Sequence, residues 1–533
     1  MLITEDIDRL LDLGYSIATE KNFVTLFDMI LEKCVDFTNA DGGTLYMASE
    51  GSLKHLLDIN RTLDSAEHKN SITEADKHTA ADDDTDIFTY CYHHPDDVLN
   101  IPDIYSDDRF DTTAIKEFDK KNSYLTQSVL VTPIMASKEE VLGVMMLYNC
   151  KDVGHNIIPF DTDYERMVQS LTAQMANTLT SMMLIQNQDE LLGSFVECMV
   201  IAIDARTPYN GKHTKHVARY CMEITDYINA LHTRGDIDVF ITPDAQEQLH
   251  MAAMLHDIGK MITPREVLNK ATRLGEGYSD LKNKLEKIRL KMKIDMLENR
   301  MTPAAWQKED ELLKSFLEQL DTFNTAGFLS DEQIAFIDSM AGKHYTDADG
   351  EKIPYLNEYE NRSLHIRKGT LTEEERLIVN RHVTYTAQML SKINFFGKYD
   401  KVREIASNHH EYLNGSGYPR GLKEDQLDIL TRIITVCDVF DSLTADDRPY
   451  KKKMTLDQAL HILNEMVDEG KLDGGIVTIV TDYMTKNFDS LLVRMKEEEI
   501  RDKEEEESKF GDFQQDGARM EETEKANGVL SNN

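Results

Sequence analysis

The chain has only six cysteines among 533 residues, and no two of them form a Cys-x-x-Cys pair. Such scattered thiols exclude a disulfide framework and are typical of reduced, mostly buried cysteines. Long hydrophobic runs are also missing, because no stretch approaches the ~18 uninterrupted apolar residues of a membrane-spanning helix. The N-terminus is acidic and amphipathic and lacks the basic-then-apolar pattern of a signal peptide. These absences predict a cytoplasmic protein with no membrane partner.

Positive charge is scarce as well, with 59 Lys and Arg against 96 Asp and Glu and a formal net charge of −37. This balance excludes general binding to DNA, RNA or an anionic membrane face. Residues 496–533 hold 13 acidic and 6 basic residues, so most of the acidity lies in the folded parts. We expect this acidic tail to be disordered. To bind an anionic substrate, this acidic chain would need a site of positive electrostatic potential, supplied by metal ions or by a few lysines and arginines.

The length predicts two or three domains. In the first, residues 1–160, a helical pattern extends to about residue 37 and is followed by strand-like runs at 44–47, 128–131 and 143–148. This order of helix, strands, an irregular middle segment, strands and helix indicates an α+β domain.

Four motifs in this region resemble a GAF domain: ADGGTLYM (40–47), NIPDIYSDDRFD (100–111), SVLVTPI (128–134) and LGVMMLYN (142–149). The resemblance covers roughly residues 20–180 and implies a sensory module. Some GAF domains bind cyclic nucleotides, but Asn149, Phe160 and Asp163 match that group's pattern only in part. The domain is therefore expected either to bind a small-molecule ligand or to act as a dimerisation and relay module without one.

Residues 161–206 contain no proline and only one glycine, Gly193, which predicts a long helix. Apolar residues recur along it at near-heptad spacing. We interpret residues 161–190 as a helical linker that joins two copies in a parallel homodimer. The alternative is that the stripe packs on its own domain. The stripe comprises Met167, Leu171, Met175, Leu179, Met182 and Met183.

Two motifs in the second half carry chemistry. HDIGK (256–260) follows an apolar run, and HHEYLNGSGYP (409–419) places two histidines before a glycine-rich turn. Asp438 lies in an apolar helix-like run, where a carboxylate is costly unless it is paired or bound to metal. His213 and His382 lie on two further expected helices.

Together these residues offer seven nitrogen and oxygen ligand groups and no thiolate. Such a set suits two six-coordinate cations, iron or manganese, better than a four-coordinate structural zinc. Two cations ~3.5–4 Å apart favour phosphoester hydrolysis. The predicted metal ligands are His213, His256, Asp257, His382, His409, His410 and Asp438.

This constellation resembles the HD-GYP family, a branch of the all-helical HD phosphohydrolases, over about residues 191–495. The resemblance implies metal-dependent hydrolysis of the bacterial second messenger cyclic di-GMP to linear pGpG or GMP. It implies that Asp257 and Lys260 are catalytic, with Lys260 on the scissile phosphate. The implied substrate-binding residues are Lys260, Gly417, Tyr418, Pro419, Arg448 and Lys451.

Four positions depart from the family's usual pattern: His216, Thr386, Asn414 and Tyr209. Members with a third metal carry a glutamate where this chain has Tyr209, so we expect two metals. Residues 271–367 interrupt the domain and predict an inserted helical hairpin plus a third helix that starts with a capping box at Ser330. Its histidines are expected to be unrelated to the site.

The leading hypothesis is a cyclic di-GMP phosphodiesterase regulated by its GAF domain. One alternative is hydrolysis of another cyclic dinucleotide, such as cyclic GMP-AMP, by the same groups. Another is a scaffold protein whose Gly-Tyr-Pro loop contacts a signalling partner.

Overall fold

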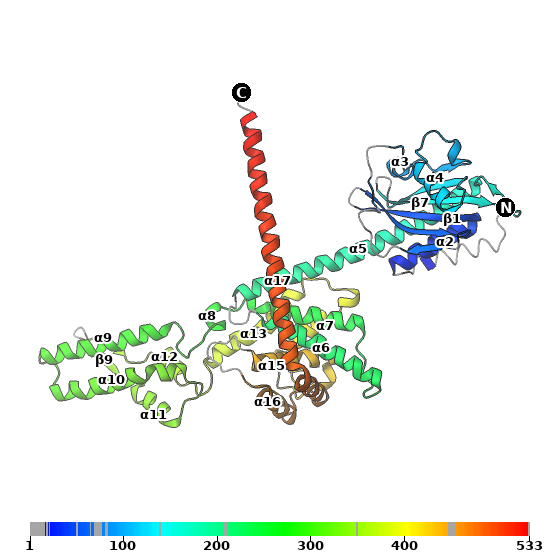
Figure 1. Ribbon diagram of the computed structural model, residues 1–533. Coiled ribbons are helices and arrows are strands. Elements are labelled where there is room, and N and C mark those ends of the chain that lie inside the picture. Colours follow the sequence, from blue (N-terminus) through cyan, green and yellow to red (C-terminus); the bar gives the residue numbers. More distant parts are fainter. Residues whose placement is uncertain are drawn as a thin grey trace. The chain divides into compact units, whose positions relative to one another are not determined.

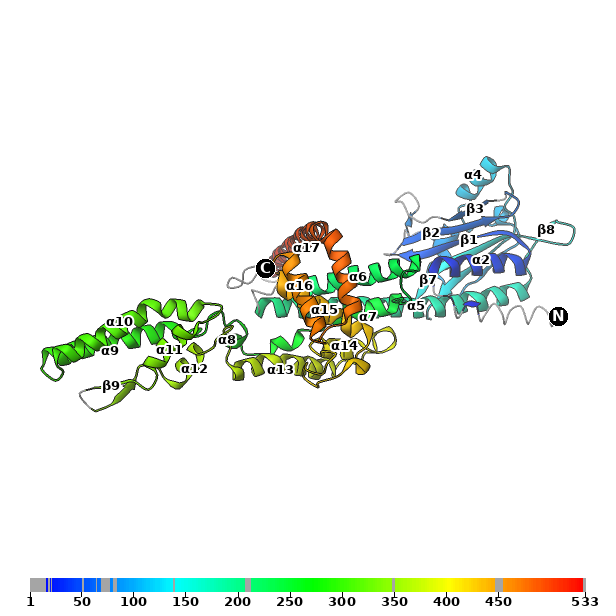
Figure 2. The same cartoon turned by 90° about the horizontal axis from the view of Figure 1, so that it is seen from below.

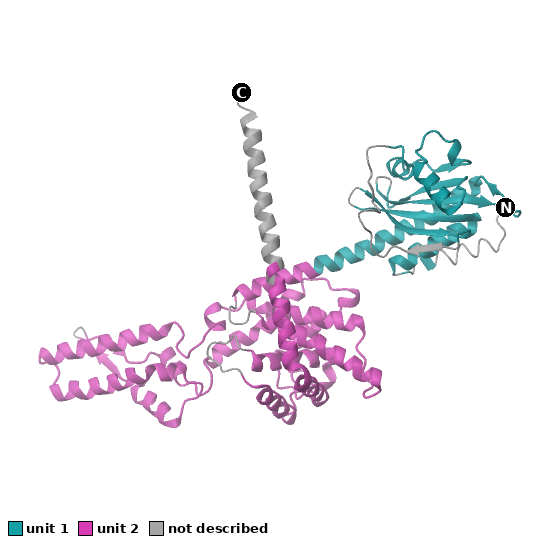
Figure 3. Cartoon of the chain, in the orientation of Figure 1, with its two compact units in different colours: residues 1–192 teal, residues 193–533 magenta. Residues whose placement is uncertain are grey.

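The structure, a computed structural model, divides into two compact units, residues 1–192 and 193–533 (Figure 3). No helix among the described residues is both long enough and apolar enough to span a membrane. The structure describes residues 16–17, 20, 22–49, 52–63, 65–68, 77–79, 84–137, 140–206, 212–347, 350–445 and 454–530. Within these ranges, the side chains of residues 65–68, 77–79, 503 and 505–530 are not described.

The first unit is built on an antiparallel sheet in the order β3-β2-β1-β7-β6-β5, with β4 paired to β2 and β8 paired to β7 (Figure 1). The expected α+β class is therefore confirmed. The strands are β1 (Ala40–Ser49), β2 (Ser52–Asn60), β3 (Ser65–His68), β4 (Lys77–Thr79), β5 (Leu99–Ile101), β6 (Val129–Met135), β7 (Val141–Lys151) and β8 (Ile157–Ile158). The helices are α2 (Phe23–Thr38), α3 (Ile87–His93), η2 (Ile104–Ser106), α4 (Thr113–Asn122) and α5 (Thr162–Arg206), which continues into the second unit.

Each face of this sheet buries its own apolar cluster, as the two-residue period of a strand requires. One cluster combines residues of the sheet with Leu31 of α2 and Leu171 of α5. The other includes Phe88 of α3 and Ile104 of η2. Both faces of the sheet are thus covered by packed side chains.

The predicted linker stripe lies largely in the first of these clusters. Leu171, Met175 and Leu179 are buried against the sheet of their own domain, and Met167 packs beside them. The alternative interpretation of the stripe is therefore correct for this part of α5. Sequence spacing alone could not decide it, because a heptad stripe buries equally well against a sheet or a second helix.

The second unit is helical, and its helices bring together segments far apart in the sequence (Figures 1 and 2). α6 packs on α7, α15 and α17, while α13 packs on η3 and α14. Their bounds are α6 (His213–Arg234), α7 (Pro243–Leu255), η3 (Ile258–Met261), α8 (Arg265–Leu268), α13 (Glu373–Leu390), η4 (Gly397–Tyr399), α14 (Val402–Asn408), η5 (Glu424–Gln426), α15 (Ile429–Thr444), α16 (Leu456–Asp468) and α17 (Gly474–Leu530).

The insertion forms a subdomain with its own apolar core. Its predicted third helix begins with the expected capping box of Ser330 and Gln333. A β-hairpin accompanies the helices and was not foreseen. The elements are α9 (Gly277–Leu297), α10 (Pro303–Thr325), α11 (Asp331–Met340), β9 (His344–Thr346), β10 (Lys352–Pro354) and α12 (Glu358–Leu364).

The acidic tail differs from the prediction of disorder, because α17 continues as helix to Leu530. Glutamate, lysine and arginine dominate the stretch 496–509, and these residues favour helix even where no core is available. A charge-rich composition therefore excludes a packed core without excluding a single helix.

Candidate metal centre

Five helical elements bring the predicted ligands together in the second unit. His213 is the first residue of α6, while His256 and Asp257 follow α7 directly. His382 lies within α13, and His409 with His410 follows α14. Asp438 lies on α15. Ligand atoms within 4.8 Å of one another form three overlapping groups: His382, His409 and His410; His213, His256 and Asp438; His256, Asp257 and His409.

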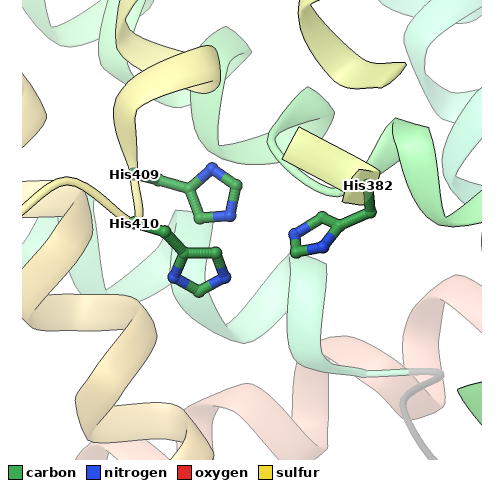
Figure 4. Close-up of side chains that lie close together, drawn as sticks. All are labelled: His382, His409 and His410. Carbon is green, nitrogen blue, oxygen red and sulfur yellow. The ribbon is translucent and has the colours of Figure 1, made fainter. Parts of the chain in front are cut away.

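Three of these histidines share one geometry. The Nδ1 atoms of His256, His382 and His409 lie 2.6–2.7 Å from the backbone carbonyl three residues earlier. Their buried Nε2 atoms have no hydrogen-bond partner. Because Nδ1 donates, the Nε2 lone pair is available to a metal. Figure 4 shows His382, His409 and His410 gathered around a shared space.

Two buried carboxylates complete the cluster. Asp257 lies 3.2 Å from Nε2 of His256, 3.3 Å from Nε2 of His382 and 3.5 Å from Nε2 of His213. Asp438 lies 3.0 Å from Nε2 of His213 and 3.6 Å from Nδ1 of His410. Asp257 therefore has imidazoles near both of its oxygens, and this carboxylate would be able to hold a cation together with them.

The electrostatics match the protonation states that metal binding needs. Burial lowers the pKa of His410 to about 4, and burial followed by the fields of His410 and His256 holds the pKa of His409 well below its usual range. Burial would raise the pKa of Asp257, but Lys260 and His256 outweigh it and hold that pKa well below normal. Neutral imidazoles and charged carboxylates are the metal-binding forms.

His213 differs from the other imidazoles. Burial disfavours its protonation, but hydrogen bonds to Asp438 and Asp441 outweigh burial and raise its pKa to about 10. Binding of a cation at Nε2 therefore requires release of a proton from this ring. Orphaned imidazole nitrogens beside buried carboxylates fit divalent cations.

Comparison with known proteins agrees with the two-part architecture. Residues 22–179 match the GAF domain family, and residues 210–326 and 360–476 each match an HD domain family. The chain joins a GAF domain to an HD domain. Residues 327–359, between the two HD matches, contain α11 and the β9–β10 hairpin of the insertion.

Three curated relatives illustrate the similarity. "3'3'-cGAMP-specific phosphodiesterase 1" of Vibrio cholerae serotype O1 is 42% identical over 117 residues, which cover 21% of this chain and 26% of the relative. "Cyclic di-GMP phosphodiesterase PA4108" of Pseudomonas aeruginosa is 37% identical over 99 residues, 19% of this chain and 23% of the relative. "Cyclic di-GMP phosphodiesterase response regulator RpfG" of Xanthomonas campestris pv. campestris is 37% identical over 136 residues, 25% of this chain and 33% of the relative. The chain thus spans a quarter to a third of the length of these relatives.

The glycine-rich loop of the HD domain is anchored beneath the histidine pair. The buried carboxylate of Glu411 accepts hydrogen bonds from the N–H groups of Arg420 (2.7 Å) and Leu422 (2.9 Å). The Tyr418 ring lies 4.9 Å from the His410 ring, centroid to centroid. A Cβ at Gly417 would meet backbone atoms at 2.4–2.6 Å, so only glycine fits there. The loop therefore places Tyr418 beside His410, and Pro419 follows it.

One departure from the family pattern, Asn414, has a structural explanation. The side-chain amide of Asn414 donates to the carbonyl of Glu469 at 2.9 Å, while its oxygen accepts from the N–H of Ser416 at 2.9 Å. A charged aspartate could make only the second bond. Lys260, on η3, forms an ion pair with Asp257 at the edge of the site.

Arg448 and Lys451 fall outside the described residues. His344 and His365 lie in the insertion, and His365 pairs with Asp338 at 2.8 Å.

Asp441, which contacts His213, was not predicted from the sequence. The Asp-x-x-Asp spacing of Asp438 and Asp441 was the available signal, because it places both carboxylates on one face of a helix.

Proposed function

We propose that this chain is a metal-dependent phosphodiesterase that hydrolyses cyclic di-GMP to linear pGpG or GMP. The observation that carries the proposal is the convergence of three orphaned Nε2 atoms with the buried carboxylates Asp257 and Asp438. The names of the relatives support a cyclic dinucleotide as the substrate class.

The seven ligand residues would hold two divalent cations, iron or manganese. When bound, these ions supply Lewis-acid activation of the phosphate and of the attacking water. Hydrolysis then forms a bond between the water oxygen and phosphorus, breaks the bond to the leaving ribose oxygen, and transfers a proton to that oxygen. Lys260, which forms an ion pair with Asp257, could place its charge on a phosphate oxygen of the substrate. The Tyr418 ring offers a face for a base of the substrate.

A second candidate substrate is cyclic GMP-AMP. The relative that is named for this substrate is 42% identical over its aligned stretch, against 37% for the two cyclic di-GMP relatives reported above. Both substrates carry the same phosphodiester, so the metal cluster itself does not distinguish them. Discrimination would depend on contacts to the bases.

The test is anaerobic purification, metal analysis and incubation with each cyclic dinucleotide, with products followed by chromatography. About two equivalents of iron or manganese and turnover of cyclic di-GMP are expected. Asp257→Ala should lose both metal and turnover. Preferred turnover of cyclic GMP-AMP would establish the second candidate, whereas absence of metal and product would favour a scaffold. Unchanged turnover in Asp257→Ala would contradict the mechanism.

We also propose that two copies of the chain form a homodimer through α5. The GAF domain would regulate the HD domain through this dimeric helix. The support is an exposed apolar stripe beyond the part of α5 that packs on the sheet: Leu184 and Leu191 are 57% and 72% exposed, and Cys198 follows seven residues later. Seven-residue spacing is that of a parallel coiled coil. Among the six cysteines, all within the described residues, Cys198 alone is exposed. Mild oxidation should therefore crosslink two copies at Cys198, and Leu191→Glu should abolish the crosslink; monomeric wild-type protein by light scattering would refute the dimer.

A further inference from the structure

His213 is oriented differently from the other imidazoles of the cluster. His256, His382 and His409 each use Nδ1 toward a carbonyl three residues earlier. His213 begins α6, so no preceding helical turn offers such a carbonyl. Its Nδ1 instead lies 2.6 Å from the carboxylate of Asp441.

Asp441 is placed for this contact by α15. It lies three residues after Asp438, one helical turn away, so both carboxylates contact the same imidazole from one helix. The Asp441 side chain is only 1% exposed, and its second oxygen lies 3.3 Å from Nδ1 of His216, one turn along α6. Burial would raise the pKa of Asp441, but hydrogen bonds with His213 and His216 outweigh it and keep that pKa below normal.

The contacts continue from His216 to the C-terminal helix. Nε2 of His216 lies 3.2 Å from Glu499 of α17. Glu499, His216 and Asp441 therefore form a chain of polar contacts from the partly exposed surface to His213, with side-chain exposures of 24%, 20% and 1%. The ring of His213 is thereby linked to a helix that contributes no predicted ligand.

The contact of this part of α17 with the start of α6 depends on charge. Lys212 pairs with Glu499, Lys215 with Asp502 at 3.2 Å, and Arg219 with Glu498 at 3.1 Å. Within the described side chains, the last buried apolar residue of α17 is Met495. Exposed ion pairs contribute only ~0.2–1 kcal/mol each and weaken with salt. The outer segment, residues 496–502, can therefore leave α6 without unfolding the core.

We propose that Asp441 is a positioning residue for the metal ligand His213, and that the outer segment of α17 controls its orientation through Glu499 and His216. A carboxylate on Nδ1–H selects the tautomer that presents Nε2 to a cation. The C-terminal helix would thus regulate metal loading of the site. This inference rests on the proposed metal-dependent function and adds an input other than the GAF domain.

The experiment titrates Mn²⁺ into the metal-free full-length chain by calorimetry, which does not depend on turnover. Asp441→Asn should weaken Mn²⁺ binding ~10–100-fold, the usual effect of removing a partner of a ligating histidine. Glu499→Gln and His216→Gln should weaken it by a few fold. Raising NaCl from about 0.05 to 0.5 M should reproduce the Glu499→Gln effect in the wild type and add nothing in the variant, because screening removes the same ion pairs.

The matched control is Glu497→Gln, an exposed glutamate outside the ion pairs described above, which should bind Mn²⁺ like the wild type. Thermal unfolding of each metal-free variant distinguishes misfolding from a loss of Mn²⁺ affinity. If Asp441→Asn fails to fold, the surface variant Glu499→Gln still tests the proposal. Unchanged Mn²⁺ affinity in both Asp441→Asn and Glu499→Gln, with wild-type binding intact, overturns the inference and leaves the proposed function standing. A wild type that neither binds Mn²⁺ nor hydrolyses cyclic dinucleotides overturns both.

Discussion

The hydroxyl of Thr386 donates a hydrogen bond to the backbone carbonyl of His256 at 2.9 Å. The same hydroxyl accepts from the N–H of Gly259 at 3.0 Å. This single side chain of α13 therefore holds both ends of the turn that carries Asp257. A Cβ at Gly259 would meet the His382 carbonyl at 1.9 Å, which shows how closely the turn and the helix approach.

Replacement of this hydroxyl tests its role. Thr386→Val keeps the shape but leaves a buried carbonyl and a buried N–H unpaired, so we expect a loss of ~1–3 kcal/mol in the free energy of unfolding and weaker metal binding. Thr386→Ser, which keeps the hydroxyl, is the control and should retain most of both. Denaturant unfolding and metal titration measure the two effects. Equal behaviour of the valine and serine variants would show that the hydroxyl is not needed.

The loop beneath the histidine pair provides a second prediction. Gly417→Ala places a methyl group 2.4–2.6 Å from backbone atoms of residues 410–412, so the loop must shift and take Tyr418 away from His410. We expect turnover to fall at least tenfold. Gly193→Ala is the matched control. A Cβ at this position of α5 would have no other atom within 4 Å, so the substitution should stabilise the helix by up to ~1 kcal/mol. Wild-type turnover in Gly417→Ala would refute this account of the loop.

Acid and alkali should destabilise the metal-free protein through different histidines. The pKa of His410 is about 4 in the folded protein, against 6.5 for a free histidine. Between pH 6.5 and 4 the unfolded chain therefore binds a proton that the folded chain does not, and the folded state loses stability as pH falls through this range. His213, with a pKa raised to about 10, contributes fully below pH 6.5 and loses that contribution as pH rises through 10.

Melting temperatures in chelator across pH 4–10 test both signs. His410→Asn should lose less stability than the wild type between pH 6.5 and 4, and His213→Gln should lose less between pH 6.5 and 10. Bound metal should suppress both differences, because it fixes the protonation state of each ring. Parallel curves for wild type and variants in chelator would contradict the assigned environments.

Arg273 supports a prediction about the insertion. Its fully buried guanidinium donates to the carbonyls of Ile366 (2.7 Å), Phe323 (3.1 Å) and Ala326. Arg273→Met should destabilise the insertion by at least ~2 kcal/mol, since it leaves buried acceptors unpaired. The chain's single tryptophan, Trp306, packs against the insertion's core, so its fluorescence reports this unfolding directly.

The metal centre should be unaffected by this change. Exposed Arg367→Met is the control for removal of an arginine near the same junction. A Trp306 melting curve that is identical in Arg273→Met and the wild type would show that the Arg273 hydrogen bonds do not stabilise the insertion.

The sequence was informative wherever a residue type is unusual in its surroundings. A carboxylate in an apolar run, such as Asp438, and a His-Asp pair after a buried helix, such as His256 and Asp257, already indicate metal ligands. Asp441 could not be found so directly, because an aspartate one turn later on a helix usually faces solvent. Its role depends on a partner, His213, that lies 228 positions earlier in the chain.

The same limit applies to whole elements. The stripe on α5 is visible in the sequence, but whether Leu171 faces a sheet or a second helix is decided by tertiary packing. The hairpin of β9 and β10 was missed because each strand has only three residues, too few to show alternation.

The two ends of the insertion lie together. The Arg273 side chain donates to the carbonyl of Ile366, and Lys270, just before the insertion, pairs with Glu375 at the start of α13. The halves of the HD domain are separated in sequence by nearly one hundred residues, and joining them across a flexible loop of that length would carry a large entropic penalty. An insertion that folds on its own core replaces that loop by a short, closed connection. We therefore expect the insertion to fold before the HD domain and to speed its assembly, so that the interruption of the domain becomes an aid to its folding rate.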